Sequence, residues 1–474
     1  MPKVKESLMS KIKQIVRKNE DLCISDGKIM CKVCPKIINF DEKHINDRVE
    51  QHLKTAKHQE NKNRNKGMHT SIINSFDQIS EKNQTKSKFS FELTEAFMNA
   101  DIPLEKLKNQ KLKTFLFKYT NQNIPHPNTL RDGYVQNIYE QKLNQIRNII
   151  EDNKIYFIID DTTDSLSRYV FNVLVGILNG FPSKPMLVST QFLEIVNSST
   201  INQAFNKACQ LIWPEGIKYD NVLLVVSDQA TTMVKAMSDA KILYPNLKHV
   251  TCLDHALHRV CETIRSHNKH ADKFITAMKR VLRKSPLRRQ LFKSVCKIRL
   301  PPVPVLTRWG SWLQTALYYL DNFDNICNFI SQLNNNSSNK AVKTAKKLIN
   351  SKDLQNQLLS LHPFRFLPEK IKYLESHSLS IRQQLDTLEE VKENLSDFAL
   401  EKLENCLAKN PDLVEFTSEA NTVDFRLKTA YSPLVSVAVE RSFSTYKSIL
   451  TDRRTNLLET NIEKFIMIKF NSLL

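Results

Sequence analysis

The chain has 474 residues, a formal net charge of +19 and a pI near 9.4. This length allows two to four domains with cores of their own. No apolar run approaches the ~20 residues of a membrane span, and the N-terminus lacks the apolar segment of a signal peptide, so we expect a soluble, intracellular protein with no membrane partner. The positive charge favours a polyanionic partner, nucleic acid first. The alternative is a lysine-rich surface that only aids solubility.

The first motif is a set of possible zinc ligands. Cys31, Cys34, His52 and His58 follow the pattern C-x2-C-x17-H-x5-H, in which a cysteine knuckle and two helical histidines can close a tetrahedral site. The five-residue gap places His58 off the face of His52, so the helix must loosen near "KTAKH". The alternatives are a chance cysteine pair with surface histidines, or His44 as a substitute ligand.

The surroundings of this motif favour DNA. Residues 1–70 carry 16 Lys/Arg against 9 Asp/Glu, as expected of a module that binds duplex phosphates. The spacing and the "HLKTAKH" ending resemble the BED-type zinc finger of transposases and chromatin factors. Over residues 22–135, "DGKIMCKVCPKIINF", "HLKTAKH" and "FMNADIPLEKLKNQKLKTFLFKYT" resemble, in this order, the family of CGG triplet-repeat-binding proteins. The polar segment 63–88 is predicted to be a linker, and helical periodicity returns over 89–150.

A mixed sheet is predicted after residue 150. The apolar run 156–159 is too short for a buried helix and fits a strand covered on both faces. Two further strands follow, "RYVFNVLVGIL" and "MLVSTQFLEIV", which we expect to be antiparallel neighbours. After the helical segment "INQAFNKACQLI", the strand "NVLLVVS" ends in Asp228, as the first strand ends in Asp160 and Asp161. If these two strands are parallel neighbours, both carboxylates emerge at one edge.

A third carboxylate lies near the C-terminus. In "LVSVAVERSFS" the residues Val435, Val439 and Phe443 predict a helix with a buried face, and Glu440 lies at the border of that face. Three carboxylates would suit Mg²⁺ or Mn²⁺, and two such ions can catalyse phosphodiester displacement. The alternatives are a surface ion pair of Glu440 with Arg441 and a helix-capping role for Asp228.

Five ordered motifs carry a second resemblance. "DDTTDS", "VVSDQATTM", "CLDHALHRV", "TRWGSW" and "VAVERSFSTYKSILTDRRTNL" are similar to motifs of hAT-superfamily transposases over residues 151–474. The resemblance implies a ribonuclease-H-like core, a catalytic triad of Asp160, Asp228 and Glu440, nuclear action, and dimerisation through the C-terminal region. Asp161 remains an alternative to Asp160. The resemblance also makes Cys252 and His255 the C-x2-H motif and Trp309 the tryptophan that helps to hold a DNA end.

The segment between the second and third carboxylates is basic. From Lys269 to Arg299 there are eleven Lys/Arg and one acidic residue, and a helical face of this charge can follow phosphates. The alternative is a solvated surface helix. The residues that we expect to contact DNA, besides Trp309, are Arg280, Arg283, Lys284, Arg288, Arg289, Arg308 and Arg441.

Together these features predict an α/β ribonuclease-H-like core interrupted by an all-α insertion and preceded by a small ββα zinc finger and a helical segment. The expected parts are a finger (20–62), a linker (63–88), a helical DNA-binding or linker unit (89–150), the first part of the core (151–261), the insertion (262–425), and the C-terminal core helix with the dimerisation region (426–474).

Three functions fit these parts. The first is a DNA transposase with structural zinc and catalytic Mg²⁺ or Mn²⁺, which acts on double-stranded DNA as a homodimer or higher oligomer. The second is a domesticated, catalytically inactive zinc-finger transcription regulator, favoured by the N-terminal resemblance and by an insertion that is short for a transposase. The third is a scaffold that dimerises through the apolar stripe of residues 430–474.

Overall fold

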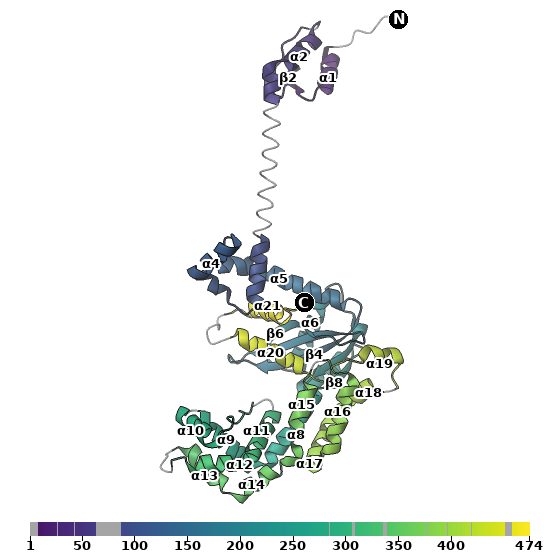
Figure 1. Cartoon of the computed structure of the whole chain (residues 1–474). Coiled ribbons are helices and arrows are strands. Elements are labelled where there is room, and N and C mark those ends of the chain that lie inside the picture. Colours follow the sequence, from purple (N-terminus) through teal and green to yellow (C-terminus); the bar gives the residue numbers. More distant parts are fainter. Residues whose placement is uncertain are drawn as a thin grey trace. The chain divides into compact units, whose positions relative to one another are not determined.

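The computed structural model resolves the chain into two units (Figure 1). One contains residues 1–92 and 114–124, and the other contains residues 93–113 and 125–474. The residues that the structure describes are 8–25, 27–41, 43–62, 87–283, 285–305, 309–334, 339–376, 378–395, 397–418, 420–450 and 457–474.

The N-terminal finger, residues 8–62, is built from helical segments around a small sheet. Its elements in chain order are α1 (Leu8–Lys18), β1 (Leu22–Ser25), β2 (Lys28–Cys31), β3 (Lys36–Ile37) and α2 (Ile45–Leu53). All strand pairs are antiparallel, and Gly27, at φ +76, supplies the left-handed backbone between β1 and β2. Ile12 and Ile15 of α1 pack into the finger core with Ile29 and Val49. The finger therefore contains more than the ββα unit expected from the sequence: α1, β3 and the helical residues 56–62 are additional.

The segment after the finger is helical wherever the structure describes it. Residues 56–62 and 87–99 are helical, and the predicted linker 63–88 lies almost entirely outside the described residues. Three elements follow: η1 (Leu104–Lys108), α4 (Gln110–Thr120) and α5 (Pro127–Ile150). The break between α4 and α5 occurs at "IPHPN", where Pro127 opens α5 and His126 caps it.

A five-stranded sheet is the centre of the second unit. Its strand order is β6-β5-β4-β7-β8. The β4–β5 and β5–β6 pairs are antiparallel, while β4–β7 and β7–β8 are parallel. The antiparallel pairing of β5 with β6 confirms the expectation, and the parallel pairing of β4 with β7 meets the condition under which Asp160 and Asp228 emerge at one edge. The strand bounds are β4 (Lys154–Thr163), β5 (Tyr169–Leu178), β6 (Met186–Leu193), β7 (Val222–Ser227) and β8 (Lys248–Thr251).

Helices cover both faces of this sheet. Phe157 of β4 contacts Phe205 of α6 (Ser198–Ile212), with ring centroids 5.0 Å apart. Its neighbours Tyr156 and Ile158 face the opposite way and share a core with Val439 of α20 (Val437–Ile449). This two-sided burial explains the continuous apolar run. The other elements beside the sheet are η2 (Tyr219–Asn221), α7 (Thr231–Ala240) and α21 (Glu459–Phe470).

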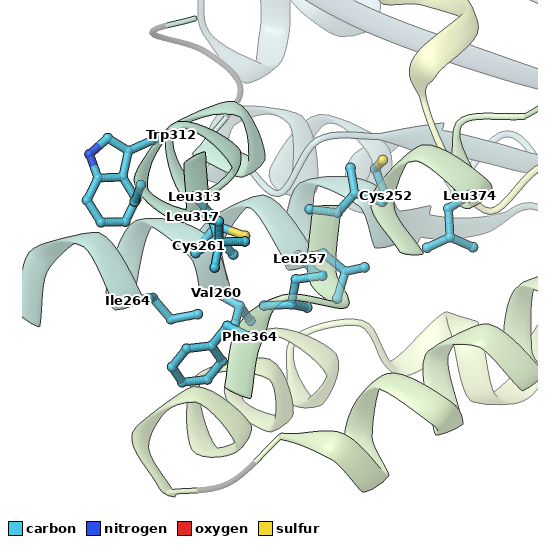
Figure 2. Packing of buried hydrophobic residues seen from close by; sticks show 14 of the residues in the cluster. Cys252, Leu257, Val260, Cys261, Ile264, Trp312, Leu313, Leu317, Phe364 and Leu374 are labelled. Carbon is cyan, nitrogen blue, oxygen red and sulfur yellow. The ribbon is translucent and has the colours of Figure 1, made fainter. Parts of the chain in front are cut away.

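A helical region continues the same core from residue 253 onward. Figure 2 shows Leu257, Val260 and Ile264 of its first helix packed near Trp312 and Phe364. The second unit is thus mixed α/β with a large helical part, and α20 and α21 return the chain to the sheet. The helices in this region are α8 (Leu253–His267), α9 (Lys269–Arg283), α10 (Pro286–Cys296), α11 (Trp309–Asp321), α12 (Phe323–Ser331), α13 (Lys340–Ile349), α14 (Lys352–Leu359), η3 (His362–Phe364), α15 (Leu367–Leu374), α16 (Ile381–Asn394), α17 (Asp397–Ala408), α18 (Pro411–Thr417) and α19 (Val423–Thr429).

Candidate zinc centre and DNA-binding surfaces

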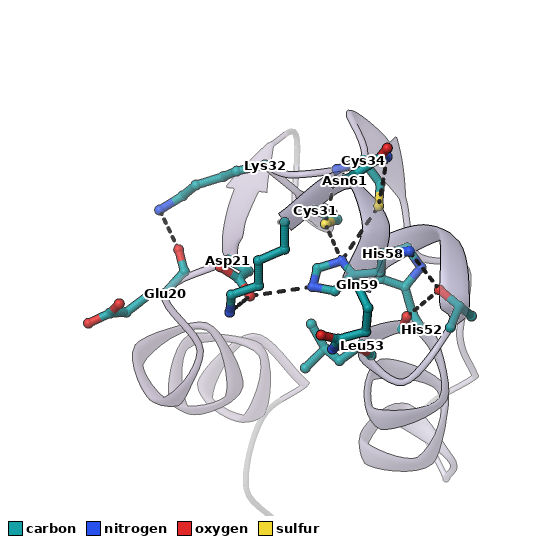
Figure 3. A network of polar contacts seen from close by, with 12 residues as sticks. Glu20, Asp21, Cys31, Lys32, Cys34, His52, Leu53, His58, Gln59 and Asn61 are labelled. Carbon is teal, nitrogen blue, oxygen red and sulfur yellow. Dashed lines mark hydrogen bonds and ion pairs between the residues drawn. The ribbon is translucent and has the colours of Figure 1, made fainter. Parts of the chain in front are cut away.

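The four predicted zinc ligands converge in the finger. Their ligand atoms all lie within 4.8 Å of one another. His58 Nδ1 is 3.4 Å from Cys31 Sγ and 3.5 Å from Cys34 Sγ, as Figure 3 shows. A tetrahedral ion with Zn–S near 2.3 Å and Zn–N near 2.0 Å would place its sulfur and nitrogen ligands about 3.5 Å apart. The cluster could therefore hold a zinc ion.

The local fold explains how His58 reaches the site. Helix α2 ends at Leu53, and a second helical segment begins at residue 56. The backbone N–H of His58 donates to Thr55 Oγ1 at 3.3 Å. This break turns His58 back toward His52, as the five-residue spacing requires. His44 does not take part, because its exposed ring pairs with Asp47 at 3.4 Å.

The ring nitrogens agree with metal binding. His52 Nε2 is buried and has no hydrogen-bond partner in this structure, so it is oriented as a ligand and not as part of a protein network. Burial, and then the neighbouring His58, lower the pKa of His52 below 6.5, which keeps the ring neutral at pH 7. Burial also raises the pKa of the Cys31 thiol, so this sulfur needs a bound cation to become a thiolate.

Asp21 supports the site from outside. Its Oδ2 lies 3.4 Å from His58 Nε2 and also accepts a hydrogen bond from Lys62. That bond, against a smaller opposing effect of burial, lowers the pKa of Asp21, so the carboxylate is charged at neutral pH. A carboxylate on the far nitrogen of a metal-bound histidine fixes its tautomer and orientation. No motif in the sequence pointed to this residue.

Replacing Asp21 with asparagine should weaken zinc binding by about 10- to 100-fold, because His58 loses its orienting carboxylate. Competition with a chromophoric chelator would measure this change. Asp41→Asn, elsewhere in the finger, is the matched control and should bind zinc as the unmodified chain does. Equal affinities for all three proteins would show that Asp21 does not act on the site.

The three predicted catalytic carboxylates lie in one neighbourhood of the second unit. Asp160 is on β4, Asp228 directly follows β7, and Glu440 is in the first turn of α20. Burial raises the pKa of Asp160 well above 3.8; the nearby His255 opposes this, whereas the charges of Asp228, Asp161 and Glu440 add to it. However, Asp160, Asp228 and Glu440 do not bring their ligand atoms within 4.8 Å of one another. Among the described residues, the groups that do so are made of other side chains.

Hydrogen bonds and pKa shifts also bear on the capping role of Asp228 and on the choice between Asp160 and Asp161. Asp228 Oδ1 accepts the Ala230 N–H at 3.1 Å, in a turn that leads into α7 and resembles the capping role considered above. Asp161 shares the raised pKa, mainly through burial and then through Asp228. The choice between Asp160 and Asp161 therefore stays a prediction.

Cys252 and His255 both hold the start of α20. The Ser436 N–H donates to Cys252 Sγ at 3.1 Å, and Ser436 Oγ is 3.2 Å from His255 Nδ1. His255 Nε2 is 3.9 Å from Glu440 Oε1. The C-x2-H pair thus positions the helix that carries Glu440.

A second anchor ties α20 to the β4–β5 hairpin. The Tyr446 hydroxyl donates to Asp164 Oδ2 at 2.6 Å, and Arg168 lies 2.8 Å from the same oxygen. Asn172 of β5 donates to Ser442 Oγ at 2.7 Å. The apolar stripe of this helix is buried within its own chain, so α20 does not offer that face to a partner. The scaffold hypothesis had assumed that this stripe binds a partner helix.

The basic helices expose their charge. Arg280 and Arg283 on α9 and Arg289 on α10 are exposed, Arg288 is half-buried, and no ion pair joins these arginines to a described acidic residue. Pro302 and Val303 lie beside Arg283 and Arg289 around a hollow. The side chains of Lys284, Arg308 and Trp309 lie outside the described residues. Arg441 is partly buried and donates to the Glu375 carbonyl at 2.8 Å.

Helix α4 presents a second basic surface. None of its residues is buried, and Phe115, Phe117 and Tyr119 are 58%, 48% and 68% exposed. Three lysines and no acidic residue accompany these rings. Exposed aromatic rings among cationic side chains are typical of nucleic-acid surfaces.

A comparison with known protein families finds a match, and it includes α4. A family model described as the CGGBP1 helical domain matches residues 80–137, a range that includes α4. No curated protein matches the chain. Among the described residues, no helix is long and apolar enough to cross a membrane.

Proposed function

We propose that this protein is a nuclear, zinc-dependent regulator that binds double-stranded DNA. The observation that carries the proposal is that a finger with a converged Cys₂His₂ group, which could hold zinc, precedes a match to the CGGBP1 helical domain in one basic chain. The same order of parts underlies the resemblance to CGG triplet-repeat-binding proteins. Duplex phosphates would supply most of the affinity.

Two surfaces support the binding of phosphates. The finger carries lysines and arginines in excess over acidic residues, and α9 and α10 expose arginines that form no ion pair with an acidic residue in the described part of the second unit. A chain with several such contacts loses affinity steeply as salt rises, because each neutralised phosphate releases a counterion.

Replacing Arg280 and Arg283 with glutamine should lower the slope of log affinity against log salt by about 2, at ~0.9 per phosphate contact. Fluorescence anisotropy with a labelled duplex between low and moderate salt would measure it. Lys235→Gln with Lys409→Gln removes the same charge from exposed positions elsewhere and should change the slope by less than half as much. Identical slopes in both variants would remove α9 from the interface.

A second candidate is a hAT-type transposase or its descendant. It is favoured by the electrostatic coupling of Asp160 with Asp228 and Glu440, and by a sheet in which three antiparallel strands precede two parallel ones. We infer that this sheet is a ribonuclease-H-like core, that the family's dimer is retained through a surface other than the stripe of α20, and that Asp160, Asp228 and Glu440 would hold Mg²⁺ or Mn²⁺ if catalysis survives.

One experiment separates the two candidates. The full chain is incubated with Mg²⁺ or Mn²⁺ and a plasmid that carries the DNA flanking this gene, beside Asp228→Asn and Glu440→Gln. The regulator predicts tight binding and no strand cleavage by any of the three proteins. Nicking by the unmodified chain that both variants lose would instead establish an active transposase.

A further inference from the structure

A serine–proline motif lies between the two basic helices of the second unit. Helix α9 ends at Arg283 and α10 begins at Pro286, and residues 284–288 read "KSPLR". Ser285 is thus followed directly by a proline and, three positions later, by the basic residue Arg288. Proline-directed protein kinases of the cyclin-dependent class select this pattern of proline and positive charge.

The motif is accessible to an enzyme. Ser285 is partly exposed, Pro286 is exposed and Leu287 is 77% exposed. The backbone of Ser285 is extended, at φ −136° and ψ 103°. The buried residues of α10 are Phe292 and Cys296, so its first turn holds no core side chain and can unwind locally at little cost.

The sequence contains a second Ser-Pro pair that serves as an internal comparison. Ser432 precedes Pro433, but Ser432 is 0% exposed, and the residue three positions after it is the apolar Val435. A kinase that requires access and a basic residue should therefore distinguish the two serines in the folded chain.

Four arginines flank Ser285 closely in sequence. Arg280 and Arg283 precede it, and Arg288 and Arg289 follow it. Arg283 and Arg289 line the same hollow, and none of the four forms an ion pair with an acidic residue that the structure describes. A phosphate on Ser285 would add a charge of about −1.5 to −2 and three acceptor oxygens, which pair well with guanidinium groups.

We propose that Ser285 is a phosphorylation site and that its phosphate weakens the binding of α9 and α10 to DNA. The second half of this inference rests on the proposed DNA-binding function. In the transfer, Ser285 Oγ forms a bond to the γ-phosphorus of ATP while the bond from that phosphorus to the bridging oxygen of ADP breaks. The hydroxyl proton passes to the catalytic aspartate of the kinase, and ADP leaves.

The position of Ser285 allows α10 to keep its fold after the transfer. As the N-cap of α10, Ser285 Oγ accepts the Arg288 N–H at 3.3 Å. Phosphate oxygens can accept the same N–H, and the positive end of the helix dipole favours their charge. A loss of DNA binding on phosphorylation would therefore follow from charge and not from unfolding.

Phosphate incorporation tests the first half of the proposal. The folded full chain is incubated with ATP and a cyclin-dependent kinase, and the modified residue is located by mass spectrometry. We expect phosphate on Ser285 and none on Ser432. Ser285→Asn, which keeps an N-cap acceptor, should take up no phosphate at that position, and Pro286→Ala should be modified at least tenfold more slowly. A folded chain without phosphate on Ser285 would overturn the proposal.

DNA binding of the phosphorylated chain tests the second half. Two phosphate contacts fewer, at ~0.9 each, should lower the slope of log affinity against log salt by about 2, which weakens binding by about 30-fold at ~0.15 M salt if affinity at 1 M is unchanged. Anisotropy with a labelled duplex would measure both quantities, and phosphatase treatment should restore them.

The matched control is Ser285→Asn after the same kinase treatment, which should bind DNA as the untreated, unmodified chain does. Equal affinities of the phosphorylated and untreated chains would overturn this inference and leave the proposed function standing. A chain that binds duplex DNA in neither form would overturn the proposed function and the regulatory half of this inference together.

Discussion

Replacing Cys34 with serine should remove one equivalent of zinc and unfold the finger, while the second unit stays folded. Structural zinc contributes about 10–16 kcal/mol of apparent binding free energy in small modules, and the core of the finger has only eight buried hydrophobic residues. A domain of this size rarely folds without such a cross-link. We expect affinity for duplex DNA to fall by about 100-fold, since the phosphate contacts of the finger are lost.

The design of the chain makes this prediction easy to measure. All three tryptophans, Trp213, Trp309 and Trp312, lie in the second unit. Their fluorescence during urea unfolding should be the same for Cys34→Ser and the unmodified chain, whereas proteolysis should cut the finger of the variant much faster. Cys23→Ser is the matched control, because Cys23 lies on β1 outside the zinc cluster. A protease-resistant finger in Cys34→Ser would contradict a structural role for zinc.

The second unit should lose about 3 kcal/mol of stability between pH 6.5 and pH 4 through His249 alone. Burial, opposed in part by Asp412, lowers the pKa of His249 to about 4 from 6.5. The unfolded chain therefore binds a proton in this range that the native chain does not, and stability falls as pH falls. Each pH unit in the window costs about 1.4 kcal/mol.

His249 also connects this titration to the candidate site. Its Nε2 lies 2.8 Å from the Oγ of Ser227, and Ser227 is the last residue of β7 before Asp228. Urea unfolding followed by tryptophan fluorescence at several pH values would measure the effect. The unmodified chain is compared with His249→Gln at each pH. Asp160 and Glu463, whose pKa values are raised, make stability rise as pH falls in both proteins, so their contribution cancels in the difference. A constant stability difference between the two proteins from pH 7 to pH 4 would contradict the prediction.

Sequence reasoning located the features with strong periodicity or fixed spacing. The apolar runs predicted β4 and β7, and the cysteine and histidine spacing predicted both the convergence of the four ligands and the break in the helix before His58. These signals are local, or they depend only on the alternation of buried side chains.

Features that depend on long-range contacts were missed. Asp21 gives no local sign that it will meet His58, which is 37 residues away. Asp164 and Tyr446 meet across 282 residues.

The most direct test of the account compares binding of the full chain to duplex DNA in its zinc-loaded and zinc-stripped forms, by anisotropy over a range of salt. The account predicts that the loaded chain binds at least tenfold more tightly, that affinity falls steeply with salt, and that added Zn²⁺ restores the stripped chain but not Cys34→Ser. Equal affinity of the loaded and stripped forms, with little dependence on salt, would contradict a zinc-dependent DNA-binding function.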